Sequence, residues 1–547
     1  MFMKLRIRTF IRIAVVCLTS LCLVLGFYSY YRLQASESQH DFDLYTLVPA
    51  SATAVFETHR LAEWFDDIDQ LQSSKERKYL HVSELFTLLK QNYRALMDDT
   101  PHGLSKQMNQ MLISFHEPDT PANQVLYCSL GREDGSLIRR MVEKYTSGSY
   151  PPKVARYRGE KLRIYPLADG RFLNLYVTNQ FLVLSFQKRL LEEVVDAAKD
   201  NTSLLANHYF RSLQERRQTH VGAALYVRMK RVQMGSVEDT LRTEVQLGTW
   251  AEFELKLSER AVYAGGISQL ADSDSVHSFA KVMSAQQPIE GFPGYRLPGS
   301  TFCFDHWALS DRKAFFDFTA RHTYAHVSLP DEVKARDARW LELLDASMAD
   351  RATTCLFTAG DSLSRRTCVV SAFPLREEVN LERELQPDLV MPLSSRSLST
   401  SAAGDPRYDL FPRARGIRCH LLRPVSLLRQ LTGVADSTWT VCAAVHRGSL
   451  LLAADAFSLA AYMDAMEQEH LLENHPLYQE AMSGLASSYS FLMMADMRRL
   501  LRQPEQYARL VPRFFYHHAD FFRHFILAVQ YTFADDMAYP NLVLLHK

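Results

Sequence analysis

The feature that most constrains the fold of this chain is that its second half repeats its first. Residues 47–65 read LVPASATAVFETHRLAEWF, and residues 296–316 read RLPGSTFCFDHWALSDRKAFF. Each segment contains a proline followed by small residues, then an apolar run, an acid and a histidine, and finally an amphipathic stretch. Self-similarity of this kind is the sequence signature of an architecture built from repeated units.

The similarity continues in the same order along both halves. Residues 110–130 resemble residues 353–373, and residues 175–198 resemble residues 442–465. The spacing between matched segments grows from about 248 to about 268 residues, as a single insertion in the second half would produce. A Ser-rich stretch at 386–407 has the composition of such an inserted loop.

Two homologous domains, at 44–290 and 291–547, are therefore predicted. Within each half, apolar residues alternate with polar ones in neighbouring short runs, and helical patterns such as 136–145 and 188–200 lie between groups of these runs. This arrangement is typical of α+β domains built on antiparallel sheets with helices.

A membrane anchor is predicted at the N-terminus. Residues 13–31 contain no charge, and at 1.5 Å per residue a helix of this length reaches about 28 Å, enough to cross the hydrocarbon of a bilayer. We expect a cytoplasmic start and transmembrane helix at 1–33, a linker at 34–43, and the rest of the chain on the extracytoplasmic side of the inner membrane. This orientation follows because basic residues stay cytoplasmic; the four that precede the apolar run are Lys4, Arg6, Arg8 and Arg12.

Cleavage of the leader is the alternative to an anchor. A lipoprotein signal needs a small residue before its cysteine, whereas Leu21 precedes Cys22. A secretory signal needs small residues at A-x-A spacing, and Leu33 occupies the first of these positions before Ala35. An uncleaved anchor is favoured, and cleavage near Ala35 stays open.

The charge balance argues against nucleic acid as a partner. Lys plus Arg and Asp plus Glu number 62 each, but five of the bases lie in the leader, which leaves the remainder about five charges acidic. Such a body has no broad basic surface for phosphate. We expect the membrane as one partner and an envelope protein or lipid as another.

The cysteines fit neither a disulfide framework nor a metal site. Of the eight, six lie outside the leader, and none forms a C-x-x-C pair. Cys355 and Cys368 are expected on the two strands of one hairpin, where they are either ordinary buried thiols or a disulfide in an oxidising compartment.

Common catalytic and cofactor motifs are absent from the sequence. It contains no P-loop, Gly-rich dinucleotide turn, G-x-S-x-G elbow, H-E-x-x-H or EF-hand loop, so no cofactor is expected. Asp520 and His524 would share one helix face at i, i+4, a spacing that suits a divalent metal with a third ligand. The phenylalanines around them favour instead a helix edge packed on a sheet.

Acid and histidine pairs recur in the two halves, as Glu57 with His59 and Asp305 with His306. An acid at a strand end can accept the free amides of the helix that follows, and its recurrence favours that structural role over catalysis. Asn207 and Asn474 are likewise predicted to be helix caps.

The leader followed by Leu47 to Ala52 (LVPASA) and a short apolar strand resembles a loosely defined group of bacterial envelope proteins of unknown function with an N-terminal anchor. The resemblance implies an envelope location and no catalytic residues.

The predicted function is that of a membrane-anchored, non-enzymatic binding or scaffold protein of the bacterial envelope. One alternative is a carrier of a lipid or other apolar ligand between the two halves. Another is an enzyme with a dispersed site, for which one half would keep a polar cluster in a cleft that the other half lacks.

Overall fold

The computed structural model describes residues 42–98, 110–130, 152–167, 169–216, 222–229, 232–234, 243–245, 247–270, 278–324, 330–360, 365–376, 419–422, 441–507, 510–534 and 537–547. The chain forms two compact units. The first contains residues up to 65 and residues 81–211, and the second contains residues 66–80 and 212–547.

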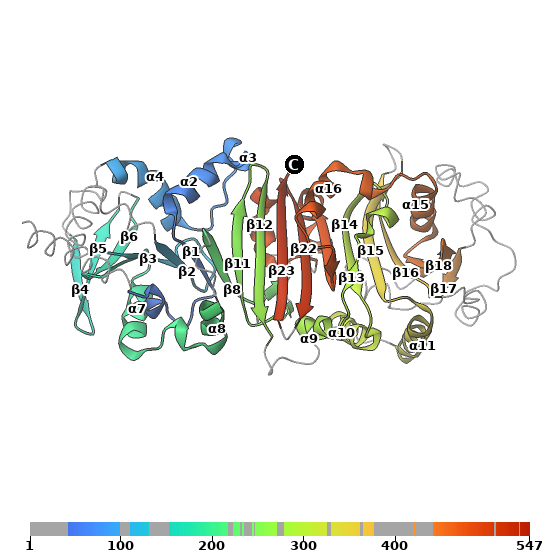
Figure 1. Cartoon of the computed structure of the whole chain (residues 1–547), viewed down its shortest axis with the longest axis horizontal. Helices are drawn as coiled ribbons and strands as arrows, with labels where there is room; N and C mark the ends of the chain where they lie inside the picture. The colour runs from blue at the N-terminus through green and yellow to red at the C-terminus, as the bar shows by residue number, and fades with distance from the viewer. Residues whose placement is uncertain are drawn as a thin grey trace, which may run out of the picture. The chain divides into compact units, whose positions relative to one another are not determined.

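The first unit contains an antiparallel sheet with the strand order β4–β5–β6–β7–β3–β2–β1 (Figure 1). One face packs against α4 and the first turn of α2, and the other packs against α7. The strands are β1 (Ala54–Thr58), β2 (Met111–Phe115), β3 (Gln124–Ser129), β4 (Lys153–Tyr157), β5 (Glu160–Pro166), β6 (Phe172–Val177) and β7 (Phe181–Ser185). The helices are η1 (Leu44–Leu47), α2 (Leu61–Gln70), α4 (Glu84–Asp98), α7 (Lys188–Asp200), η2 (Leu204–Ala206) and α8 (His208–Arg216), of which α2 and α8 continue into the second unit.

The second unit has a longer antiparallel sheet with the order β8–β11–β12–β23–β22–β21–β14–β15–β16–β19–β18–β17 (Figure 1). Its strands are β8 (Ala223–Arg228), β11 (Trp250–Leu257), β12 (Ala261–Gln269), β14 (Thr301–Ala308), β15 (Arg351–Ala359), β16 (Arg366–Pro374), β17 (His420–Leu422), β18 (Val441–His446), β19 (Ser449–Ala453), β21 (Phe491–Asp496), β22 (Phe525–Ala534) and β23 (Met537–His546). Two separate ribbons pair β9 (Val232–Met234) with β10 (Thr243–Val245), and β13 (Ile289–Glu290) with β20 (Ser488–Tyr489).

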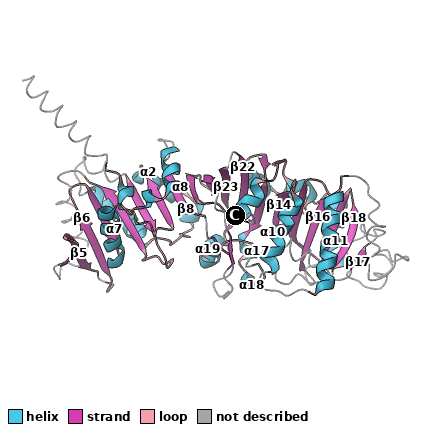
Figure 2. Cartoon of the chain, turned by 90° about the horizontal axis from the view of Figure 1, so that it is seen from below, coloured by secondary structure: helices cyan, strands magenta, loops and turns pink. Residues whose placement is uncertain are grey.

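Helices cover both faces of this second sheet. Figure 2 shows α10 and α11 lying over β14 and β16. The helices are α3 (Gln72–Lys75), α9 (Phe279–Ser284), η3 (Pro293–Arg296), α10 (Arg312–Tyr324), α11 (Asp331–Ser347), α15 (Ala456–Glu467), η7 (Leu472–Asn474), α16 (Pro476–Ser483), α17 (Met497–Leu500), α18 (Pro504–Tyr507), α19 (Arg513–His517) and α20 (Ala519–Phe522).

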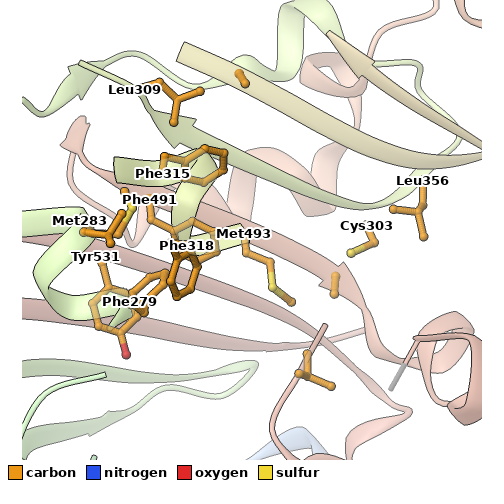
Figure 3. Close-up of a cluster of buried hydrophobic side chains, with 14 of the residues drawn as sticks. Phe279, Met283, Cys303, Leu309, Phe315, Phe318, Leu356, Phe491, Met493 and Tyr531 are labelled. Carbon is orange, nitrogen blue, oxygen red and sulfur yellow. The ribbon is translucent and has the colours of Figure 1, made fainter. Parts of the chain in front are cut away.

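Two hydrophobic cores result from this arrangement. On one face, α15 and α16 pack over the sheet. On the other, aromatic side chains from α9 and α10 meet those of the strands (Figure 3). The ring of Phe279 lies 5.6 Å from that of Phe491 and 5.4 Å from that of Tyr531, both in edge-on geometry. Such pairs stabilise a core by about 0.5–1.5 kcal/mol beyond their buried area.

The same succession of elements occurs twice. Apart from α3, β4, β5, β9 and β10 in the first half and β17, β20, α17, α18, α19 and α20 in the second, the order η1, β1, α2, α4, β2, β3, β6, β7, α7, η2, α8, β8, β11, β12 is repeated as η3, β14, α10, α11, β15, β16, β18, β19, α15, η7, α16, β21, β22, β23. Isolated bridges also recur at matching places, between Pro49 and Ser203 and between Pro298 and Leu471. The limits predicted for two domains, 44–290 and 291–547, stay a prediction, because the compact units divide elsewhere.

Pairing of β12 with β23 explains why the second unit includes the last strands of the first half. Gly265 lies four residues after Ala261, the first residue of β12, and Asn541 lies four residues after Met537, the first residue of β23, so the two positions correspond. In the β12–β23 ladder, Gly265 lies directly opposite Asn541. A residue paired with its own counterpart marks a local two-fold axis, so the two hairpins are related by symmetry within the second unit.

The structure bears out the α+β class with antiparallel sheets and the helix predicted at 188–200, which is α7. The predicted anchor at 1–33, most of the linker at 34–43, the helix at 136–145 and the Ser-rich loop at 386–407 lie outside the described residues. Among the described residues, no helix is long and apolar enough to cross a membrane.

Substitution of Gly266 tests how closely the central strands pack. A Cβ atom at Gly266 would lie 2.7 Å from the Phe253 ring and 2.8 Å from the Pro540 ring, whereas one at Gly265 would meet Asn541 Oδ1 at 3.6 Å. We expect Gly266→Ala to lower the free energy of unfolding by roughly 1–3 kcal/mol through overpacking. The measurement is urea denaturation of the full chain in detergent. Gly265→Ala is the matched control, and equal losses for both variants would contradict the close approach at Gly266.

Candidate functional site

The β4–β5 hairpin at the edge of the first unit's sheet is held firmly on one of its faces. Its two turn residues, Arg158 and Gly159, have φ of 47° and 88°, as a two-residue type I′ turn requires. The Arg158 guanidinium bonds the carboxylates of Asp196 at 2.8 Å and Asp200 at 2.7 Å, both on α7. Tyr157 also donates to Asp196, at 2.9 Å. The hairpin is thereby fixed against the helix.

Cations gather on the opposite face of the same hairpin. Arg156 lies directly across from Lys161, and Val154 lies across from Arg163, so these four residues share one face, which we call the basic face. Among the residues that the structure describes, Arg156, Lys161 and Arg163 have no carboxylate within ion-pair distance. Arg156 and Lys161 repel each other, because like charges directly opposite each other destabilise a strand pair. The apolar side chain of Val154 on the same face is 51% exposed.

The backbone of β4 is also open to a partner. Within the described part of the chain, β4 pairs with β5 alone, and it is the outermost strand of its sheet (Figure 1). An open edge offers its free N–H and C=O groups to an added strand. Positive side chains on the edge oppose pairing with a second copy of this chain, which leaves a partner of opposite charge.

A second polar arrangement lies inside the first unit as an unbroken chain of hydrogen bonds. Ser51 Oγ lies 3.0 Å from Glu193 Oε2 and 3.2 Å from His116 Nδ1. His116 Nε2 lies 2.8 Å from Ser114 Oγ, which lies 3.0 Å from the Tyr127 hydroxyl. Burial, together with the charge of Arg189, lowers the pKa of His116 to about 4, so this imidazole is neutral near pH 7.

Proton counting gives this chain one direction. A carboxylate only accepts, so Ser51 donates to Glu193 and must itself accept from Nδ1–H of His116. The neutral ring then accepts at Nε2 from Ser114, and Tyr127 donates to Ser114. His116 therefore donates a hydrogen bond to the exposed Ser51. In this arrangement its imidazole cannot accept the proton of the Ser51 hydroxyl, as a general base would.

The polar chain has a structural role, because its inner members are sealed from substrate. Ser114 and Tyr127 are fully buried and His116 is 3% exposed. Strand register matches these three positions to Cys355, Phe357 and Ala372 in the second half. At these positions the first half thus keeps polar side chains that the second half lacks, and Ser114, His116 and Tyr127 are buried.

The candidate metal ligands Asp520 and His524 do not share a helix face. The helix α20 ends at Phe522, so His524 lies beyond it, and Asp520 pairs with Arg523 at 3.1 Å. Among the described residues, no group of three or more His, Cys, Asp or Glu side chains has an arrangement that could hold a metal ion.

The two acid and histidine pairs occupy different environments. Glu57 is buried and accepts from Tyr45 at 2.9 Å, with His59 Nε2 also 2.9 Å away. Asp305 lies within β14, where burial raises its pKa to about 7, and it accepts from the Thr354 amide at 3.2 Å. The prediction that this acid caps the next helix is wrong, because Asp311 accepts from the Ala314 amide at the start of α10.

His306 is buried, and none of the described carboxylates lies within ion-pair distance of it. Its Nδ1 lies 3.1 Å from the Thr353 hydroxyl, and burial lowers its pKa to about 3. Strand register and the bridges at Pro49 and Pro298 match His306 to Glu57 rather than to His59.

Two further predictions have mixed outcomes. Asn207 accepts from the Phe210 amide at 3.1 Å and caps α8 as predicted, whereas Asn474 ends η7 and the N-cap of α16 is His475. Cys355 and Cys368 lie on the strands of one hairpin as predicted, and both are free thiols.

Neither the basic face nor the polar chain was predicted from the sequence. Residues 153–166 contain an Arg-Gly turn signal at Arg158 and Gly159 with alternating residues on both sides. This pattern predicts a hairpin with Arg156, Lys161 and Arg163 on one face. Ser51, His116 and Glu193 are too far apart in sequence for any local pattern to connect them.

Comparison with known proteins adds little to this geometry. No family model matches the chain, and no curated protein matches it. The chain is similar to a solved structure described as crystal form I of TP0453, with 11% identity over 43% of this chain and 81% of that chain, and a TM-score of 0.24.

Acid should weaken the first unit through His116. Between pH 6.5 and about 4 the unfolded chain binds a proton that the folded imidazole does not, so the stability falls as the pH falls through this window, by on the order of 3 kcal/mol in total. We expect His116→Phe, which copies the residue of the second half, to flatten this dependence in urea titrations of the full chain. His208→Gln, at an exposed position, is the control. An unchanged slope in His116→Phe would refute the assignment.

Proposed function

We propose that this chain is a membrane-anchored, non-enzymatic binding protein of the bacterial envelope, and that the basic face of the β4–β5 hairpin holds an acidic partner protein. The observation that carries the proposal is the set of three cations, Arg156, Lys161 and Arg163, on one face of the hairpin at the sheet edge, without a carboxylate partner in the described part of the chain. An extended acidic segment that adds to β4 would relieve their mutual repulsion and bond the free backbone at once.

The leader supports a location near the bilayer. Residues 32–43, fully extended, reach at most about 40 Å from the end of the apolar run to the start of the first unit. A hairpin in the first unit is therefore held within a short distance of the membrane surface, where the partner has to approach it. Electrostatic attraction to an acidic partner would raise the rate of encounter and make it dependent on salt.

The polar chain also fits a binding protein. Every member of it has its hydrogen bonds satisfied by another member, which rigidifies the interior and leaves no group free for catalysis. The groups of this unit that a partner can reach are the cations of the basic face and the free backbone groups of β4.

Photo-crosslinking from Val154 tests the partner. A photoreactive residue at this position, in the full chain in its native cell, is expected to give an adduct with a protein. The adduct should fall about tenfold when Arg156→Glu and Lys161→Glu are combined, because two attractive charges become repulsive.

Two controls use the same hairpin region. A photoreactive residue at Phe172, which is 56% exposed and lies on the other face of the sheet, should not give the adduct. Lys153→Glu, on the same strand but the other face, should have a smaller effect than the double variant. Equal capture from Phe172, or capture of lipid alone from Val154, would overturn the proposal of a protein partner.

The uncleaved anchor is tested separately. N-terminal sequencing of the protein from membranes is expected to begin at the initiator methionine or its neighbour, because the position three residues before the nearest cleavage candidate is Leu33. A sequence that begins near Ser36 would show a released protein and would remove the tether from the proposal.

A further inference from the structure

A small cavity lies in the second unit, away from the basic face. It is bordered by the start of β14, the connection from η7 to α16, and the end of β21 with α17, it opens to solvent, and its volume is about 130 Å³. A cavity of about 150 Å³ accommodates benzene. This cavity is therefore of the right size for a molecule of about six heavy atoms and too small for a lipid.

Five of the twelve lining residues are apolar and buried. Phe302 and Met494 are each 4% exposed, Leu472 is 2% exposed, and Tyr478 and Ile526 are each 5% exposed. An apolar lining of this kind favours a hydrocarbon group over water.

One lining side chain has a buried polar atom that no other described residue satisfies. Thr301 is 7% exposed, and its hydroxyl oxygen has no hydrogen-bond partner among the residues that the structure describes. A buried hydroxyl left unpaired is unfavourable, so a polar atom bound in the cavity would remove that cost. The corresponding residue of the first half is Ala52. The Ala52 amide donates to the Pro49 carbonyl at 3.1 Å, and the Thr301 amide donates in the same way to the Pro298 carbonyl at 3.0 Å. The hydroxyl is therefore not needed for the local backbone.

A second lining residue supplies a positive charge. The guanidinium of Arg499 donates to the Thr358 hydroxyl at 3.2 Å and lies 5.5 Å from the centre of the Phe302 ring. The nearby Asp496 carboxylate accepts from Lys547 and from the Arg498 amide. Among the described residues, Arg499 has no carboxylate within ion-pair distance, so its charge is available at the wall of the cavity.

We propose that this cavity binds a small monocarboxylate with a branched or short hydrocarbon tail. The carboxylate pairs with Arg499, whose planar guanidinium matches it in a two-point contact, and accepts from the Thr301 hydroxyl. The tail lies among Phe302, Met494 and Ile526. A phosphate dianion suits the site less well, because Asp496 also lines it and only one guanidinium faces it.

Equilibrium dialysis of radiolabelled isobutyrate against the full chain in detergent tests the proposal. Isobutyrate has six heavy atoms and should bind saturably at one site per chain. Isobutyramide, which has the same shape without the charge, and inorganic phosphate should each compete at least about tenfold more weakly, because the guanidinium selects a planar anion.

Variants assign the binding to this cavity. Arg499→Gln should weaken isobutyrate binding about tenfold or more, and Thr301→Ala should weaken it by about threefold to tenfold. Arg498→Gln, one residue away and exposed, is the matched control and should leave the affinity unchanged. Circular dichroism checks folding, and Thr301→Ala is tolerated in principle because the first half has alanine at that place.

Each outcome of the binding experiments bears on a stated part of the proposal. Absence of saturable isobutyrate binding at millimolar concentration overturns the proposal. Equal binding of isobutyramide overturns the role of Arg499, as does an equal loss in Arg498→Gln. Tighter binding of phosphate than of isobutyrate would assign the cavity to a different anion. None of these results depends on the basic face, so the proposed partner binding stands or fails on its own experiment.

Discussion

The antiparallel pairing of β12 with β23 is the interaction on which the second unit depends. It joins a hairpin from the first half of the chain to a hairpin from the second, and so removes one open edge from each. The two hairpins meet where Gly265 lies opposite Asn541, and the neighbouring Gly266 lets the Phe253 and Pro540 rings close over the strand. Because side chains alternate between the faces of a sheet, this register also decides which residues face each core.

The two halves share one order of elements but solve the same packing problem differently. Beneath α7, the first half buries Ser114, His116 and Tyr127 and satisfies them through a directed chain of hydrogen bonds. Beneath α15, the second half has Cys355 and Phe357 on the matching strand, next to a contact of His306 with the Thr353 hydroxyl. Replacing one member of the hydrogen-bonded chain in the first half by its apolar counterpart would leave a neighbouring polar group unpaired, which is costly in a buried network.

Parts of the fold could be predicted because local patterns specify them. The alternation around Cys355 and Cys368 specified a hairpin, and the apolar spacing at 188–200 specified α7. The prediction that Asp520 and His524 share one helix face was wrong, because α20 ends after one turn at Phe522. Beyond it the chain enters β22, which pairs with β23. Periodicity alone does not reveal where pairing with a distant strand ends a helix.

By itself, the sequence determined the α+β class, the repeated order of segments, the hairpins and several helices, since each is specified by residues close together in the chain. Only the tertiary structure decided that Arg156, Lys161 and Arg163 share one unpaired face, and that Thr301 and Arg499 line one cavity. The reason is physical: whether a charge or hydroxyl is satisfied depends on neighbours that strand register and helix packing bring from far along the chain. The repeat is visible in the letters, but its consequences for binding depend on which side chains the fold leaves without a partner.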